Sequence, residues 1–112
     1  MDKKAFYIFQ EDLVKITPSD SGVCITEIVN LLNLYCSPNM RKLRTVQISS
    51  FLVKKGYLYE ADKGVNRPTQ KGKLLGIYIG RRESKANNTY LVNLYNGRAQ
   101  QYIFDHLYDI LS

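Results

Sequence analysis

The stretch Ile48–Ile77 reads ISSFLVKKGYLYEADKGVNRPTQKGKLLGI and carries the signals that decide the fold. The apolar residues at its start have the i, i+3, i+4 spacing of one helix face: Ile48, Phe51 and Leu52. Gly56 is the residue type that most often follows a helix end, and Thr45 is a suitable N-cap. The sequence therefore predicts a helix from about 45 to 55.

The residues that follow predict a short β-hairpin over about 57–69. Tyr57–Glu60 has strand-forming residues, and the turn after it is built around Gly64. The return strand is short and contains Pro68, which has no backbone N–H to donate to a ladder. That strand must therefore lie at an edge.

Upstream of this stretch, two further helices are predicted. The first begins at an N-cap, Thr26, and carries an apolar stripe of Ile28, Val29, Leu31 and Leu32. Pro38 then breaks the chain and suits the first turn of a short helix, Asn39–Leu43.

Downstream, Thr69 is expected to cap one helical turn, Gln70–Leu75. A second hairpin is expected to pair Ile77–Arg82 with Thr89–Tyr95 across a polar loop. Asn96 should then cap an amphipathic C-terminal helix over about 97–111. We find no linker, so residues 1–112 are expected to form a single α+β domain.

Three helices followed by a hairpin is the winged helix-turn-helix arrangement. The stretch Ile48–Ile77 resembles the recognition helix end, wing and Thr-x-x-Gly turn of bacterial and phage winged-helix regulators, through its Gly-Tyr-Leu and Arg-Pro-Thr-x-x-Gly motifs. The ending Leu94–Leu107 resembles loosely that of small proteins from phages and mobile elements. The resemblance implies a recognition helix at about 45–55 and a wing at about 57–69.

The positive charge of the chain is concentrated in one segment. Residues 37–85 hold twelve Lys/Arg against three Asp/Glu, whereas both flanking regions are slightly acidic, and the whole chain has a formal charge of +6. Because that segment also contains the predicted helix and hairpin, its charge favours contact with a nucleic-acid backbone.

The candidate contacts follow from these elements. The helix face opposite its apolar stripe, together with the residues at its start, is expected to reach base edges: Arg44, Thr45, Gln47, Ser50 and Lys54. Cations in the preceding short helix, the wing and the turn after it are expected to contact phosphates: Arg41, Lys42, Lys63, Arg67 and Lys71. The second hairpin adds a further basic edge: Arg81, Arg82 and Lys85.

The apolar residues of the predicted C-terminal helix spread over more than one side of it. Ile103 and Leu107 are expected to face the core, which leaves Tyr108 and Leu111 for a two-fold contact between two chains. The alternative is that this helix only closes the core against the apolar segment Phe6–Phe9.

Other classes of protein are disfavoured by what the sequence lacks. There is no phosphate-loop, metalloprotease or Ser/His/Asp motif, so we expect no enzyme and no cofactor. One histidine and the separated Cys24 and Cys36 do not make a metal site. No apolar run approaches membrane-spanning length and no signal peptide is evident, so we expect a cytoplasmic protein without a membrane span.

The expected function is therefore non-enzymatic binding of double-stranded DNA, as a small transcriptional regulator of phage, mobile-element or bacterial type. Two alternatives remain open. One is a winged-helix interaction module that binds or inhibits a host protein or nucleoprotein complex. The other is binding of RNA or single strands through the tyrosines that alternate with the cations.

Overall fold

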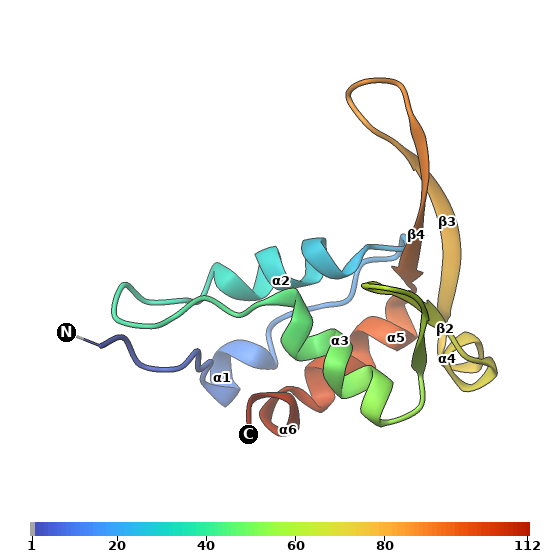
Figure 1. Cartoon of the computed structure of the whole chain (residues 1–112). Helices are drawn as coiled ribbons and strands as arrows, with labels where there is room; N and C mark the ends of the chain where they lie inside the picture. Colours follow the sequence, from blue (N-terminus) through green and yellow to red (C-terminus); the bar gives the residue numbers. More distant parts are fainter. Residues whose placement is uncertain (1) are drawn as a thin grey trace.

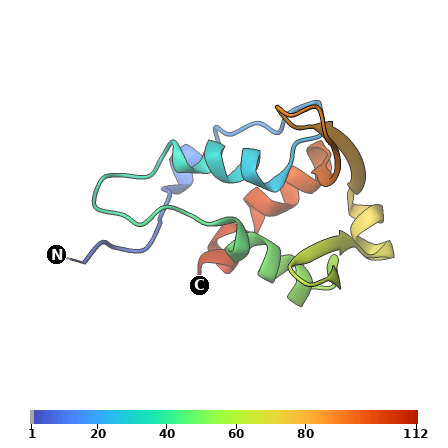
Figure 2. The same cartoon turned by 45° about the horizontal axis from the view of Figure 1, so that its top comes forward.

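The apolar faces of the helices meet in one core in the computed structural model, which describes residues 2–112. The helices around it are α2 (Ile25–Asn33), α3 (Thr45–Lys54), α5 (Gly97–Asp105) and α6 (Leu107–Leu111). Figure 2 shows α5 running between α2 and α3. Burial of each large side chain stabilises the fold by about 1.5–3 kcal/mol. The largest fully buried side chains are Ile8, Ile28, Leu32, Leu43, Ile48, Leu52, Ile77, Tyr95, Ile103 and Leu107.

Two antiparallel hairpins complete the α+β architecture. The first pairs β1 (Leu58–Asp62) with β2 (Val65–Pro68), and the second pairs β3 (Ile77–Glu83) with β4 (Thr89–Tyr95). The short helix α4 (Gln70–Leu75) joins them. The first hairpin lies against α3, whereas the second projects away from the helices (Figure 1). No helix among residues 2–112 is long and apolar enough to cross a membrane.

Local turn and cap signals determine where several elements begin and end. Gly64 has a φ of +75° in the first hairpin turn, and Gly76 has a φ of +121° at the end of α4. Both are conformations that glycine adopts without steric cost. The Thr69 hydroxyl accepts a hydrogen bond from the backbone of α4, and the Asn96 side chain does the same for α5. These caps lie where the sequence predicts them.

The caps of α2 and α3 differ from the predicted ones. Cys24 is the N-cap of α2, and its backbone N–H donates to Oε1 of Glu27 at 3.0 Å. Arg44 is the N-cap of α3, and its N–H donates to Oε1 of Gln47 at 2.9 Å. In both helices the third residue reaches back to the cap residue. The N-cap therefore lies two residues before the expected Thr26 in α2 and one residue before the expected Thr45 in α3.

The short helix predicted over Asn39–Leu43 is wrong. The chain between α2 and α3 is extended there, because its backbone groups bond to other segments. The Asn33 side chain bonds both the N–H and the C=O of Leu43, at 2.8 and 3.0 Å. Lys4 and Met40 also form a parallel β-bridge. A helix would require these groups to bond within the segment.

The C-terminal helix is also not continuous over 97–111 as predicted. It is broken at His106, whose φ of −108° and ψ of 13° end α5 and begin α6. The His106 N–H donates to the carbonyls of both Tyr102 and Ile103. The break lets Leu107 and Ile110 enter the core, and α6 contacts α3.

Candidate nucleic-acid interface

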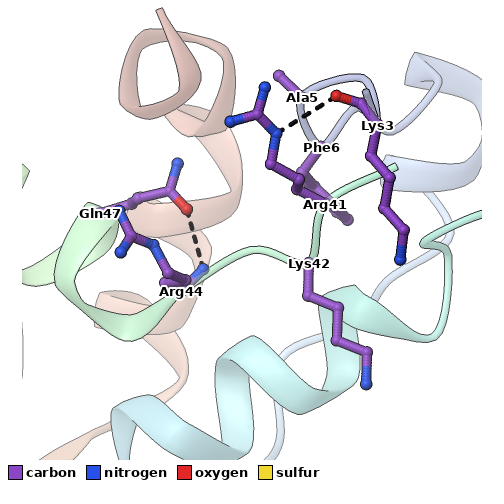
Figure 3. A pocket seen from close by; sticks show the side chains of 7 residues that line it. All are labelled: Lys3, Ala5, Phe6, Arg41, Lys42, Arg44 and Gln47. Carbon is purple, nitrogen blue, oxygen red and sulfur yellow. Dashed lines mark hydrogen bonds between the residues drawn. The ribbon is translucent and has the colours of Figure 1, made fainter. Parts of the chain in front are cut away.

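A hollow of about 650 Å³ lies beside the first turn of α3. Figure 3 shows Gln47 of α3 on one side of it, and Lys3, Arg41 and Lys42 on the other. Four of its seven lining residues are Lys or Arg, and none of the seven is Asp or Glu. The hollow is therefore a region of positive potential. Its lining residues are Lys3, Ala5, Phe6, Arg41, Lys42, Arg44 and Gln47.

Hydrogen bonds between two distant segments build one wall of this hollow. The Lys4 N–H donates to the Asn39 carbonyl at 2.8 Å, and the Arg41 N–H donates to the Lys4 carbonyl at 2.7 Å. The Arg41 side chain also donates through Nε to the Lys3 carbonyl at 3.3 Å (Figure 3). Arg41 is therefore held by both its backbone and its side chain.

The start of α3 forms the other wall. The N-terminus of a helix carries a partial positive charge, which adds to the charge of Arg44 in the hollow. Gln47 lines the hollow, whereas the sequence predicts it on the outer face of α3. Its carbonyl oxygen is used by the cap of α3, and its amide nitrogen is the group that remains to donate.

The outer face of α3 is formed by small polar and aliphatic side chains. Val46 is 49% exposed and Val53 is 39% exposed, and Ser49 and Ser50 lie between them. These residues line a groove of about 540 Å³ between α3 and the first hairpin. Three predicted contacts also line it, namely Thr45, Ser50 and Lys54.

The first hairpin is fixed in place by one side chain of β4. The Asn93 amide donates through Nδ2 to the Asn66 carbonyl at 2.8 Å, and its Oδ1 accepts from Nη1 of Arg67 at 3.1 Å. Arg67 is half-buried in this contact. We predicted a free phosphate contact for Arg67, but its guanidinium is used to join the two hairpins.

Replacement of Asn93 with alanine is expected to loosen the first hairpin. The change removes both bonds made by Asn93 and leaves only the 3.3 Å bond from Arg67 Nη1 to the Asn66 carbonyl, which costs about 1–2 kcal/mol. Hydrogen exchange of the Val65–Arg67 amides should become faster. Asn88→Ala, in the exposed loop of the second hairpin, is the matched control. Equal exchange in the two variants would contradict this role of Asn93.

Two more of the predicted cations have partners within the chain. Lys71 donates from Nζ to the Lys55 carbonyl at 2.8 Å, and lies 4.4 Å from the Tyr57 ring centroid. Lys71 therefore satisfies a backbone carbonyl at the C-terminal end of α3. Arg82 forms an ion pair with Glu27 at 2.6 Å, which is the only ion pair among residues 2–112.

The Arg82 pair influences the titration of Glu27. The pKa of Glu27 lies below its ordinary value, chiefly because the Cys24 N–H donates to the carboxylate, and also because Arg82 is close. A carboxyl with a lowered pKa stabilises the fold at neutral pH, and that contribution is lost as the pH falls through the lowered pKa. Both side chains are partly exposed, so the contribution is small.

The remaining predicted cations are exposed. Lys63 lies in the turn of the first hairpin, and Lys85 lies in the loop of the second. Arg81 lies on β3 next to Arg82, and alternation along a strand directs their side chains to opposite faces of the hairpin. Arg81 therefore faces away from the side on which Arg82 contacts α2.

The C-terminal helices close the core against the segment before α1 (Gln10–Leu13). Both residues predicted to face the core are buried. Tyr108 donates its O–H to the Ile8 carbonyl at 2.8 Å and stacks on Tyr7. Leu111 is half-buried against the core. Much of the surface assigned to a two-fold contact is therefore used within the chain, and the dimer stays a prediction.

Light scattering tests that dimer. If Tyr108 and Leu111 join two chains, the protein should have the mass of a dimer at high micromolar concentration, and Leu111→Asp should reduce it to a monomer. A wild-type protein with the mass of a monomer under these conditions would contradict the two-fold contact.

Several residues that line the hollow and the groove are not identified by the sequence alone. Val46 and Val53 were not considered because their apolar side chains gave no indication of an exposed face. Lys3 was missed because no local pattern relates it to Arg41, and only the bridge between their segments brings them together. Ser49 was missed because the exposed face of α3 was placed around Gln47.

Comparisons with protein-family models, with curated proteins and with solved structures found no match to this chain. The function is therefore argued from the residues of the interface themselves.

Proposed function

We propose that this chain is a non-enzymatic protein that binds double-stranded DNA and acts as a small transcriptional regulator. The observation that carries the proposal is the hollow with four cations and no carboxylate in its lining, next to the exposed face of α3. A duplex presents phosphates on both sides of a groove, so a basic site beside an exposed helix matches its geometry.

In this proposal the domain is a winged helix with an altered helix-turn-helix. The supporting features are the order α2, α3, β1 and β2, and the position of the first hairpin beside α3. The connection between α2 and α3 is extended, whereas a helix-turn-helix has a turn of about 3–4 residues. Arg41 and Lys42 therefore contact phosphates from this connection and not from a helix that crosses the backbone.

The outer face of α3 would enter the major groove. The hydroxyls of Ser49 and Ser50 can bond base edges, and the methyl groups of Val46 and Val53 can contact thymine methyl groups. The hollow at the start of α3 would hold the backbone at the groove edge. Lys63 at the hairpin turn would contact a neighbouring phosphate.

Placing a negative charge on this face should weaken DNA binding. Ser50→Asp is expected to reduce the affinity for duplex DNA by about tenfold or more, because the carboxylate opposes phosphates and base acceptors. Fluorescence anisotropy of a labelled duplex measures the change. Thr17→Asp adds the same charge at an exposed position after α1 and is the control. Equal losses in the two variants would show that α3 does not face the DNA.

Competition between nucleic acids tests the class of ligand. A labelled duplex of random sequence should be displaced by unlabelled duplex at lower concentration than by single-stranded DNA or RNA of the same length. A preference for single strands would replace the proposal with the tyrosine-based alternative.

The second hairpin supports a second candidate function, which is interaction with a protein. Ile79 and Leu91 are about half exposed on the face that also carries Arg81. Aliphatic side chains of this kind suit a protein interface. This candidate predicts that the wild-type protein has no affinity for DNA, and that Ile79→Asp or Leu91→Asp abolishes its binding to a protein partner.

A further inference from the structure

We infer that the hollow beside α3 is a self-contained site for consecutive phosphate groups and that Lys3 is one of its binding residues. The inference deepens the proposed function, because it assigns to the hollow an affinity for a phosphate chain that does not need the rest of a duplex. The ligand class is two or three neighbouring phosphate groups, either successive phosphodiesters of a nucleic-acid backbone or the linked phosphates of a free polyphosphate.

The backbone segments that carry Lys3 and Arg41 are held together, and the Arg41 guanidinium is held in place, before any ligand arrives. The segment that contains Lys3 and Lys4 is joined to Asn39 and Arg41 by two backbone hydrogen bonds, at 2.8 and 2.7 Å. The contact from the Arg41 side chain to the Lys3 carbonyl fixes that guanidinium further. A backbone and a guanidinium fixed in this way lose less conformational entropy on binding than a flexible segment would.

The chemistry of the lining selects phosphate. Arginine and lysine side chains donate several hydrogen bonds to phosphate oxygens, and the Gln47 amide adds a neutral donor. None of the four cations has an ion-pair partner among residues 2–112. A lining without carboxylates would repel metal cations and favour anions.

The hollow has no exposed aromatic ring in its lining. Its volume of about 650 Å³ lies in the range of small-molecule sites. The aromatic ring that lines it belongs to Phe6, which is 5% exposed and packed in the core. The hollow therefore offers no free aromatic face on which a base could stack, and its cationic lining favours the phosphate groups of a ligand.

Calorimetry with inorganic tripolyphosphate tests the inference on the full chain in metal-free buffer. The wild-type protein should bind, and Lys3→Ala should raise the Kd by about 3–5-fold, the worth of one exposed ion pair. Lys4→Ala is the matched control. It removes the same charge from the neighbouring residue, whose side chain does not line the hollow. The Kd of Lys4→Ala should therefore rise by less than that of Lys3→Ala.

The inference is overturned if tripolyphosphate does not bind, or if the two variants lose affinity equally, which would indicate a general effect of net charge. A second arm separates the two sources of phosphate. Displacement of labelled duplex DNA by tripolyphosphate, weaker in Lys3→Ala, would show that the DNA backbone occupies the hollow. Binding that depends on Lys3 without displacement of DNA would support the inference for a free phosphate ligand and count against the proposed function.

Discussion

Replacing Arg41, Lys42 and Arg44 together with alanine is expected to weaken binding of duplex DNA by about 100- to 1000-fold at 0.1 M salt. These three cations line the hollow beside α3. Each phosphate contact contributes about tenfold to affinity at this salt concentration through counterion release. Anisotropy of a labelled duplex measures the loss.

The triple variant has a matched control. Lys15→Ala, Lys73→Ala and Arg98→Ala together remove the same charge at exposed positions outside the hollow. We expect this control to lose less than about tenfold, because charges beyond a Debye length are largely screened. The cap of α3 uses the backbone of Arg44, so the triple variant should remain folded. Equal losses in the two triple variants would show that DNA binding depends on the total positive charge of the chain and not on the hollow.

Replacement of Gln100 with leucine is expected to cause the largest loss of stability. Gln100 is 2% exposed, and its Oε1 accepts from the Ser19 N–H at 2.8 Å. Its Nε2 donates to the Tyr95 carbonyl at 2.9 Å and also reaches the carbonyls of Ser19 and Ser21. Leucine has a similar size, so the change mainly leaves these backbone groups without partners, at about 1–3 kcal/mol for each buried one.

The expected loss for Gln100→Leu is about 2–4 kcal/mol, which lowers Tm by about 10–20 °C in a domain of this size. Gln101→Leu is the control, because Gln101 is exposed on the same helix and bonds only Asp105. Thermal unfolding followed by circular dichroism measures both. A Tm for Gln100→Leu within a few degrees of the control would show that water replaces the lost partners.

Elements that depend on neighbouring residues were predicted well from the sequence. The first hairpin turns at Gly64, and the caps Thr69 and Asn96 stand where their local signals place them. Each of these features is decided within a few residues by backbone geometry or by a side chain that bonds the next turn. The apolar spacing of α3 likewise identified its buried face at Ile48 and Leu52.

Features that depend on distant segments were not predicted. The helix expected at Asn39–Leu43 is replaced by extended chain, because Lys4 and Asn33 supply the hydrogen bonds that a helix would have formed internally. Arg67 and Arg82 show the same limit, since their partners Asn93 and Glu27 lie far away in the sequence. Charge identified the basic segment, but the structure was needed to separate free cations from those used within the fold.

We propose that the hollow beside α3 binds phosphates of duplex DNA. The salt dependence of binding tests it most directly, measured for the wild-type protein and for the variant Arg41→Ala, Lys42→Ala, Arg44→Ala over about 50–200 mM salt. Each phosphate contact contributes about −0.9 to the slope of log K against log salt concentration. We expect a wild-type slope about 2.7 units steeper than that of the variant, for three phosphate contacts. Equal slopes, or a wild-type protein that does not bind DNA, would contradict the proposal.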